Sequence, residues 1–219
     1  MADSLDIIFK AYDVRGIYPD QFDDAVAKKV GNAFVRFTGA STVVVGYDMR
    51  PSSIPLSRAF IEGATLAGAD VVDVGLASTD LIYFASGTLD APAAMFTASH
   101  NPAEYNGIKM CRAGAAPVGE ATGLLQIKEA VAAGLVERAE ELGKVTRQDL
   151  LEPFAEHVRS FVDRAALRPL RVVADTANGM GGLVVPKVFE GLPFELSMLF
   201  EELDGSFPNH PADPIQPEN

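Results

Sequence analysis

Apolar residues in the first part of the chain alternate between helical spacing and short continuous runs. One face of a predicted helix carries Val26, Val30, Phe34 and Phe37. Asp23 and Asp24 suit the start of this helix, and Gly39 suits its end. The apolar run at 42–45, next along the chain, predicts a buried strand.

The same alternation continues further along the chain. Leu56, Phe60 and Ala64 share a face of a second predicted helix. Ser52 and Ser53 offer hydroxyls to cap its start, and Gly68 is its stop. The next apolar run, at 71–74, predicts another strand. Strands that alternate with helices indicate an α/β fold, with helices on both faces of a mixed, mostly parallel sheet.

The second half of the chain repeats this organisation. A helix over 119–134 closes the first domain, and the charged stretch 137–144 connects it to the second domain. We place the boundary near Val145, which divides the chain into domains at 1–145 and 146–219. Further elements are expected as a long amphipathic helix over 148–165, strands at 171–174 and 194–199, and a helix at 184–189.

Glycine and proline clusters interrupt the second domain. The glycine-rich run 178–182 lacks the Lys-Ser/Thr of a P-loop, so we predict a structural turn whose glycines supply positive φ, with a phosphate cradle as the alternative. The proline-rich end at 208–217 predicts an extended or disordered tail. His210 with Asp213 offers two metal ligands without a third, which is too few for a convincing site.

Composition and charge exclude several classes of function. The chain has 219 residues, of which 48% are hydrophobic, enough to bury one large core or two small ones. The single cysteine cannot form an internal disulfide, and the N-terminus lacks a signal-like segment, so a cytoplasmic location is expected. No apolar run approaches the roughly 18 residues that span a bilayer. A formal charge of −12 argues against nucleic-acid binding.

The candidate reactive side chains of the chain lie in the stretch 95–110. The apolar run 93–96 predicts a buried strand, and Asn101-Pro102 and Asn106-Gly107 are turn dipeptides that come after it. Ser99 therefore lies just past the carboxyl end of a strand, where ligands collect in α/β sheets. A serine becomes reactive when a base deprotonates it, or it can carry a phosphate itself, with His100 and Lys109 to neutralise charge or move protons. The alternative is a solvated loop whose polar residues only make turns.

The longer match favours the reactive loop. The run Thr-Ala-Ser-His-Asn-Pro at 97–102, followed by Asn-Gly-Ile-Lys at 106–109, resembles the phosphoserine loop of the α-D-phosphohexomutases, the phosphomannomutase/phosphoglucomutase group. Four other segments are similar to signatures of that family in the same order, at 9–16, 45–53, 174–182 and 208–219. The resemblance implies three-layer αβα domains, with the first domain complete and the second partial.

The resemblance also implies a two-step mechanism. Phosphorylated Ser99 would pass its phosphoryl group to a hexose 1-phosphate or 6-phosphate, such as that of mannose or glucose. The bound hexose 1,6-bisphosphate would then turn over and return its other phosphate to Ser99. Lys109 corresponds to the general acid/base, and His100 either shares the proton transfer or orients the loop.

Other motif residues would contact phosphate. The resemblance places Arg15 beside the phosphoserine, with Tyr12 next to it, and assigns Asn101 to phosphate binding. Arg50 would also bind phosphate, although a surface arginine at a helix start is an equally good interpretation of this residue.

Family loops that complete such a site are absent from the sequence. The family holds Mg²⁺ on an Asp-Gly-Asp-x-Asp-Arg loop and on a phosphoserine oxygen, here that of Ser99, but the nearest fragment is Asp204-Gly-Ser206. The sugar-binding loop and a second phosphate-binding loop are missing too. We therefore expect a truncated chain that is inactive alone, with sugar preference and oligomeric state undetermined. The alternatives are a non-catalytic sugar-phosphate binding or interaction module and, less favoured because no Gly-x-Ser-x-Gly surrounds Ser99, a serine hydrolase.

Overall fold

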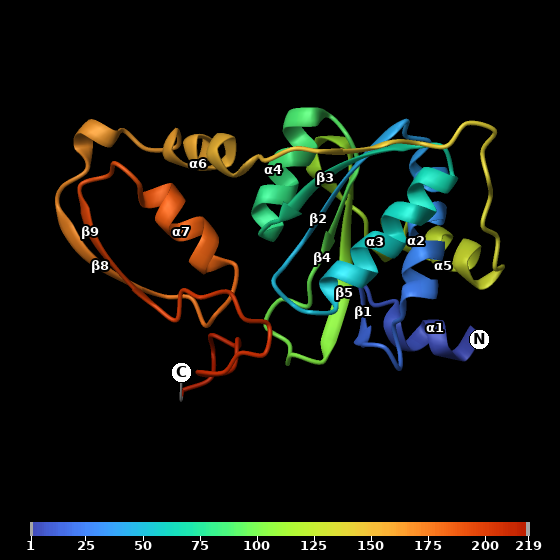
Figure 1. Ribbon diagram of the computed structural model, residues 1–219, viewed down its shortest axis with the longest axis horizontal. Coiled ribbons are helices and arrows are strands. Elements are labelled where there is room, and N and C mark those ends of the chain that lie inside the picture. The colour runs from blue at the N-terminus through green and yellow to red at the C-terminus, as the bar shows by residue number, and fades with distance from the viewer. Residues whose placement is uncertain (1, 218–219) are drawn as a thin grey trace.

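The computed structural model describes residues 2–217, which form a larger α/β part and a smaller second part (Figure 1). The helices are α1 (Ala2–Ile8), α2 (Asp24–Thr38), α3 (Ser53–Leu66), α4 (Thr79–Leu89), α5 (Leu124–Ala132), α6 (Leu151–Arg159) and α7 (Gly181–Phe189). The strands are β1 (Val14–Ile17), β2 (Thr42–Tyr47), β3 (Asp70–Leu76), β4 (Ala93–Phe96), β5 (Tyr105–Arg112), β6 (Ala116–Pro117), β7 (Val145–Arg147), β8 (Leu170–Asp175) and β9 (Phe194–Leu199).

The main sheet is mixed and confirms the predicted fold class. Its strand order is β1-β5-β4-β2-β3-β7, with β6 paired to β5. Strands β4, β2, β3 and β7 run parallel, whereas β5 is antiparallel to both β1 and β4. In the second part, β8 and β9 form a parallel pair joined through α7. Val145, the predicted domain boundary, is the first residue of β7, the outer strand of the main sheet. The division of the chain into two domains at this residue stays a prediction.

Local signals predicted helix α2 well. The side chain of Asp23 accepts a hydrogen bond from the Val26 amide at 2.8 Å, and Gly39 ends the helix in the left-handed region at φ 63°. Ser52 and Ser53, in contrast, do not cap α3, because their hydroxyls are committed to the side chains of Asn106 and Asp48. The capping prediction was wrong because it considered only neighbouring residues. Asn106, which binds both hydroxyls, is more than fifty positions away in the sequence.

Two other predictions about elements need correction, and several elements were not predicted. The expected helix over 148–165 is shorter, because α6 ends at Arg159 and the chain turns, which leaves Phe161 73% exposed. The dipeptide Asn106-Gly107 is not a turn but lies inside β5, opposite Gly16 and Arg15 of β1. Helix α4 and the antiparallel strands β1 and β5 were not predicted.

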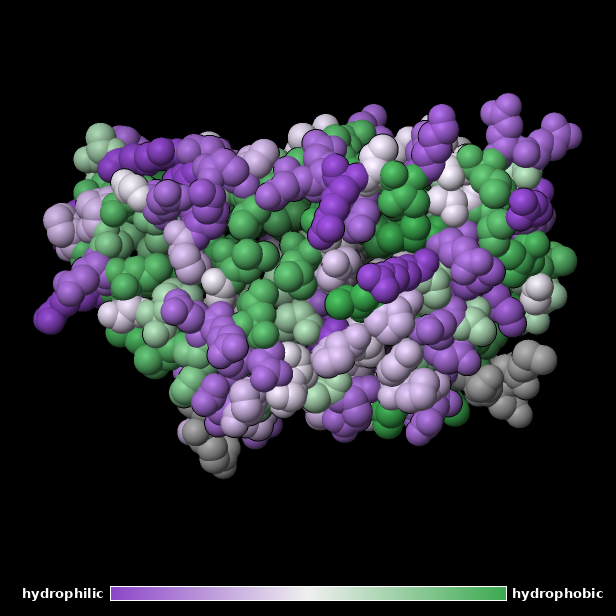
Figure 2. All heavy atoms as spheres, in the orientation of Figure 1, coloured by the Kyte–Doolittle hydropathy of each residue, from purple (hydrophilic) through white to green (hydrophobic). Residues whose placement is uncertain are grey.

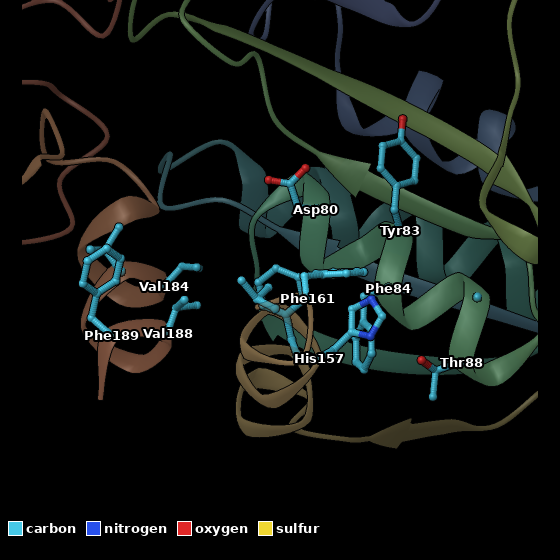
Figure 3. Close-up of a pocket in the computed structure, with 13 residues that line it drawn as sticks. Asp80, Tyr83, Phe84, Thr88, His157, Phe161, Val184, Val188 and Phe189 are labelled. Atoms are coloured by element: carbon cyan, nitrogen blue, oxygen red, sulfur yellow. The ribbon is translucent and has the colours of Figure 1, made fainter. Parts of the chain in front are cut away.

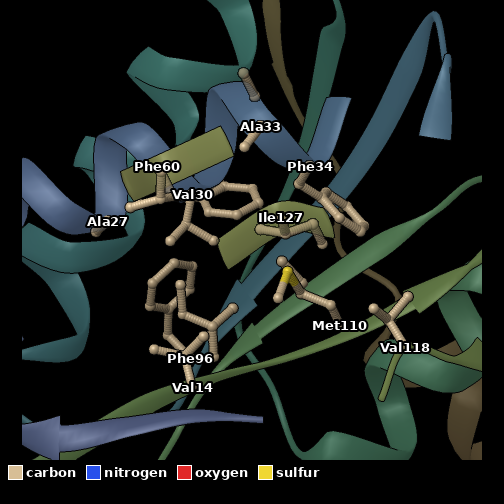
Figure 4. Packing of buried hydrophobic residues seen from close by; sticks show 14 of the residues in the cluster. Val14, Ala27, Val30, Ala33, Phe34, Phe60, Phe96, Met110, Val118 and Ile127 are labelled. Atoms are coloured by element: carbon tan, nitrogen blue, oxygen red, sulfur yellow. The ribbon is translucent and has the colours of Figure 1, made fainter. Parts of the chain in front are cut away.

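Helices cover both faces of the main sheet. One apolar cluster joins alternate residues of the strands to α1, α2, α3 and α5, and Figure 4 shows the rings of Phe34, Phe60 and Phe96 at its centre. The Phe34 and Phe60 rings are 5.9 Å apart, and those of Phe60 and Phe96 are 5.5 Å apart. The opposite face packs against α4 and α6 in a second cluster. The first domain therefore has three αβα layers.

The backbones of α2 and α3 come into direct contact at glycines. A Cβ added to Gly63 would overlap the carbonyl oxygen of Lys28 and come within 3.0 Å of the Asn32 amide nitrogen. We expect Gly63→Ala to lower the free energy of unfolding by about 1–3 kcal/mol, since overpacking forces the helices apart. The measurement is denaturant unfolding, with Gly87→Ala as the control.

Gly87 is the matched control because it lies inside α4, where an added Cβ meets nothing within 4 Å. Its replacement should leave stability unchanged or raise it by up to about 1 kcal/mol, as helix propensity predicts. Equal stabilities for the two variants would contradict the close helix contact.

The glycine-rich run 178–182 turns the chain into α7, which begins at Gly181, but its glycines do not supply the positive φ that was predicted. The alternative of a phosphate cradle stays a prediction. The left-handed backbone occurs at Ala177 (φ 46°) and Asn178 (φ 58°) rather than at a glycine. The glycines instead allow close approach, because a Cβ on Gly182 would overlap the carbonyl oxygen of Glu201. Among the residues described, no helix is both long and apolar enough to cross a membrane.

Candidate functional site

Ser99 is displayed at the carboxyl edge of the main sheet. It comes after β4, its side chain is exposed, and its backbone is left-handed at φ 54°. The Ser99 amide donates to the Thr97 hydroxyl at 3.0 Å, which helps to hold this sparsely populated conformation. The serine lines a cleft of about 220 Å³ between the two parts, beside Asp48, Ser78 and Gly179. The hydroxyl thus faces a space that a small ligand can enter.

The loop that carries Ser99 is held by Arg50. One guanidinium nitrogen of Arg50 donates to the carbonyl oxygens of Pro102 (2.6 Å) and Tyr105 (3.1 Å). The other donates to the carbonyl oxygens of Ser99 (2.9 Å) and Asn101 (2.7 Å). The interpretation as a surface arginine was wrong, because the side chain is fully buried. Its guanidinium donors are occupied by Asp48 and the loop carbonyls, and phosphate binding by Arg50 stays a prediction.

The rest of the motif at 48–53 supports this arrangement. Asp48 lies 3.3 Å from Nε of Arg50 and accepts the Ser53 hydroxyl at 2.6 Å. The side-chain amide of Asn106 donates to the hydroxyls of Ser52 and Ser53 at 2.8 and 2.9 Å. Burial lowers the pKa of Arg50, and Asp48 opposes that shift. The network therefore joins the start of α3 to both ends of the Ser99 loop.

A lysine at position 50 is not expected to hold the Ser99 loop as Arg50 does. A lysine ammonium has three donors, while the Arg50 guanidinium makes five hydrogen bonds, so buried loop carbonyls would lose their partners. We expect Arg50→Lys to lower the free energy of unfolding by about 2–4 kcal/mol in denaturant titrations. The control is Arg58→Lys on α3, where the arginine is exposed and the change should be within about 0.5 kcal/mol. Equally small losses of unfolding free energy in Arg50→Lys and Arg58→Lys would contradict the conclusion that Arg50 holds the loop.

Two cations meet at one carboxylate beside the loop. Asp13 binds Nη2 of Arg15 at 2.6 Å and Nζ of Lys109 at 3.3 Å. Arg15 also bonds the side-chain oxygen of Asn101 and, at 3.4 Å, the carbonyl oxygen of Ala98. The fold therefore brings Arg15, Lys109 and Asn101 together, as expected for a phosphate site.

Sequence reasoning missed Asp13. It stands two residues before Arg15, and the antiparallel pairing of β1 with β5 places it near Lys109. Asp13 comes immediately before β1, so its acidic side chain close in sequence to Arg15 was the available signal. Nε of Arg15 is buried and has no hydrogen-bond partner in the described chain.

His100 and Tyr12 are placed differently. Nδ1 of His100 lies 3.3 Å from the Ser99 hydroxyl oxygen, a distance at which either group can donate, depending on the tautomer. Tyr12 is 81% exposed on the turn before β1, and it is not among the described residues that line the Ser99 cleft. The structure thus brings His100 to the serine. Like Tyr12, the candidates His100, Arg15, Asn101 and Lys109 are not among the described residues that line the Ser99 cleft.

The described residues contain no group of three or more His, Cys, Asp and Glu side chains that could hold a metal ion. His210 does not pair with Asp213 as a metal site; its Nε2 lies 3.0 Å from Asp175, and this hydrogen bond raises the pKa of His210. Asp204 accepts from the Ser206 hydroxyl at 2.7 Å within its own turn. The residues 2–217 therefore do not fit a complete Mg²⁺ site.

A larger, apolar cavity of about 810 Å³ lies apart from this chemistry, between α4, α6 and α7. Figure 3 shows Val184 and Val188 of α7 pointing toward Phe161 and Phe84. Apolar side chains are also exposed on the second part, to the left in Figure 2, and Val173 of β8 is 67% exposed.

Comparisons with known proteins agree with the geometry. Residues 6–136 match the model of phosphoglucomutase/phosphomannomutase α/β/α domain I, and residues 152–219 match that of domain II. The chain is 39% identical over 212 residues to the phosphohexose mutases of Xanthomonas campestris pv. campestris, covering 96% of this chain and 47% of that relative.

Further similarities point the same way. The chain is 37% identical over 221 residues to a phosphoglucomutase of Neisseria gonorrhoeae, covering 97% of this chain and 46% of that relative. It is also similar to the crystal structure of a phosphoglucomutase/phosphomannomutase family protein from Burkholderia thailandensis, with a TM-score of 0.87, 34% identity, and coverage of 96% of this chain and 47% of that one. The chain spans about half the length of the curated relatives it matches.

Proposed function

The chain belongs to the phosphoglucomutase/phosphomannomutase family, and we propose that it supplies the phosphoserine half of an enzyme that interconverts hexose 1-phosphates and hexose 6-phosphates. Ser99 is the phosphoryl carrier in this proposal. The observation that supports it most directly is the exposed Ser99 hydroxyl on a left-handed turn whose carbonyl oxygens at Ser99 and Asn101 are held by a buried arginine. Such a turn presents the oxygen in one orientation, as group transfer requires.

The neighbouring side chains have defined roles. In the first step the bond between the Ser99 oxygen and phosphorus breaks, a bond from phosphorus to the sugar hydroxyl oxygen forms, and the hydroxyl proton is removed. The released serine oxygen takes up a proton. Lys109 lies beside Asp13 and moves this proton: its neutral amine accepts the proton of the sugar hydroxyl, and the ammonium so formed passes it to the released serine oxygen. His100 lies close enough to Ser99 to share the transfer.

Arg15 provides the charge that a phosphoryl group needs. Its Nη groups are anchored by Asp13 and Asn101, so the guanidinium is fixed in position beside the Ser99 loop. A fixed cation aimed at developing negative charge stabilises the transition state without reorganisation. We therefore assign phosphate binding to Arg15, with Asn101 as its support.

In this proposal, residues other than those around Ser99 bind Mg²⁺ and the sugar. A phosphate on Ser99 would offer oxygen ligands to Mg²⁺, but the described chain adds no cluster of carboxylates around it. We derive no step through the metal. The same observation favours, for this stretch in isolation, the second candidate function, which is sugar-phosphate binding without turnover.

Phosphate mapping tests the proposed function. The chain is incubated with glucose 1,6-bisphosphate or mannose 1,6-bisphosphate, digested, and analysed by mass spectrometry for a phosphoryl group on Ser99. Phosphate on Ser99 is the expected result. Hexose-phosphate binding by calorimetry with no phosphate on Ser99, both in this chain and in the full-length protein, would support the binding module instead.

A further inference from the structure

A short segment of the second part, residues 204–207, lies directly on the arginine that holds the Ser99 loop. The ring of Phe207 stacks over the guanidinium of Arg50, with 5.0 Å between the guanidinium carbon and the ring centroid. Gly205 is buried against the backbone beside it, since an added Cβ would come 2.6 Å from Cα of Arg50 and 2.9 Å from Cδ of Pro51. Contact this close leaves no room for water between Gly205 and the Arg50 backbone.

The segment is itself anchored in the second part by Asn178. The side chain of Asn178 is buried; it donates to the carbonyl oxygen of Glu202 at 3.0 Å and accepts from Asn209 at 2.8 Å. Its carbonyl oxygen accepts from the amide of Asp204 at 2.9 Å. The left-handed backbone of Phe207, at φ 53°, is a conformation that persists only where surrounding contacts hold it. The position of the Phe207 ring is therefore set by the second part.

The contact has a physical consequence for the loop. The in-plane donors of Arg50 are all used on Asp48 and the loop carbonyls, so only the flat faces of the guanidinium remain for other partners. An aromatic ring on one face attracts the cation and excludes water that would compete for those carbonyls. The Arg50 side chain is 0% exposed with this ring in place. Each loop hydrogen bond is thus stronger than it would be in contact with solvent.

We propose that Phe207 and Gly205 are positioning residues for the Ser99 loop. They act through Arg50, so that the orientation of the Ser99 oxygen depends on the second part being seated on the first. The catalytic consequence rests on the proposed function of Ser99, whereas the mechanical link stands on these contacts alone.

Hydrogen exchange and kinetics on the full-length protein test this link. In Phe207→Ala we expect amide exchange in residues 98–105 to accelerate about 10- to 30-fold, the factor that corresponds to a desolvated cation–π contact. We expect kcat to fall by a similar factor, because the Ser99 oxygen loses its fixed orientation. Phe207 also lines the Ser99 cleft, so the exchange rate over 98–105, and not KM, decides the mechanical link. Phe207→Tyr, which keeps the aromatic face, should restore both quantities.

Two further variants separate an effect on the Ser99 loop from poor folding of the alanine variant. Phe207→Leu retains an apolar side chain without a π face, so it should show the loop effect even if the alanine variant folds poorly. Phe161→Ala, at an exposed ring remote from Ser99, is the control and should change neither quantity. Unchanged exchange over 98–105 in both the alanine and leucine variants would overturn the proposal. If the wild-type protein takes up no phosphate at Ser99, the proposed function fails, and the exchange data still decide the link.

Discussion

Replacement of Ser99 by alanine is expected to abolish phosphoryl transfer in the full-length protein, with a loss on the order of 10⁶-fold, as when other enzymes lose a nucleophile. The loop offers no substitute hydroxyl. Thr97, the other hydroxyl residue of the Thr-Ala-Ser-His-Asn-Pro motif, is buried and accepts from the Ser99 amide. The measurement combines phosphate mapping after incubation with a hexose 1,6-bisphosphate and a coupled assay of mutase turnover.

The matched control for Ser99 is Ser160→Ala. Ser160 is exposed just after α6 and donates to the carbonyl oxygen of His157, so its loss should leave phosphate uptake and turnover unchanged. Substantial turnover by the Ser99 variant, or phosphate recovered on a different serine of the wild-type protein, would show that another residue carries the phosphoryl group.

The second large effect is expected at Lys109. We predict that Lys109→Ala in the full-length protein lowers kcat by about 10²- to 10⁴-fold, the range for loss of a general acid or base. The ammonium lies on β5 and is oriented by Asp13 at 3.3 Å, so its position does not depend on substrate. After the substitution Asp13 keeps its ion pair with Arg15, at 2.6 Å, which limits the damage to the loss of one cation.

Lys109→Arg separates proton transfer from charge. Arginine keeps a cation next to Asp13 but does not release its proton in proteins. If Lys109 moves a proton, the arginine variant should be nearly as slow as the alanine variant, with KM close to that of the wild type. Recovery of kcat by arginine, or an effect of alanine confined to KM, would instead make Lys109 a phosphate-binding residue.

Local patterns predicted several elements of the first domain, including the strand that leads to Ser99. The helical spacing that ends at Gly39 and the buried runs at 42–45 and 93–96 depend on neighbours within a few residues, and each of these elements is confirmed. Antiparallel β5 escaped notice because Asn106-Gly107 has the local signature of a turn. In the fold, Asn106 is buried against Ser52 and Ser53, and Gly107 faces the carbonyl oxygen of Val14 so closely that a Cβ would overlap it.

By itself, the sequence determined the α/β class, the family signatures and the position of Ser99 just after a strand, because these depend on periodicity and on short contiguous motifs. Only the tertiary structure decided the roles of Arg50, Asp13 and Phe207. Arg50 bonds carbonyls about fifty positions away, and Phe207 reaches it from the second part. Spacing along the chain records which residues are apolar or charged, but the partner of a buried guanidinium is set by the packing of distant segments, which no local pattern encodes.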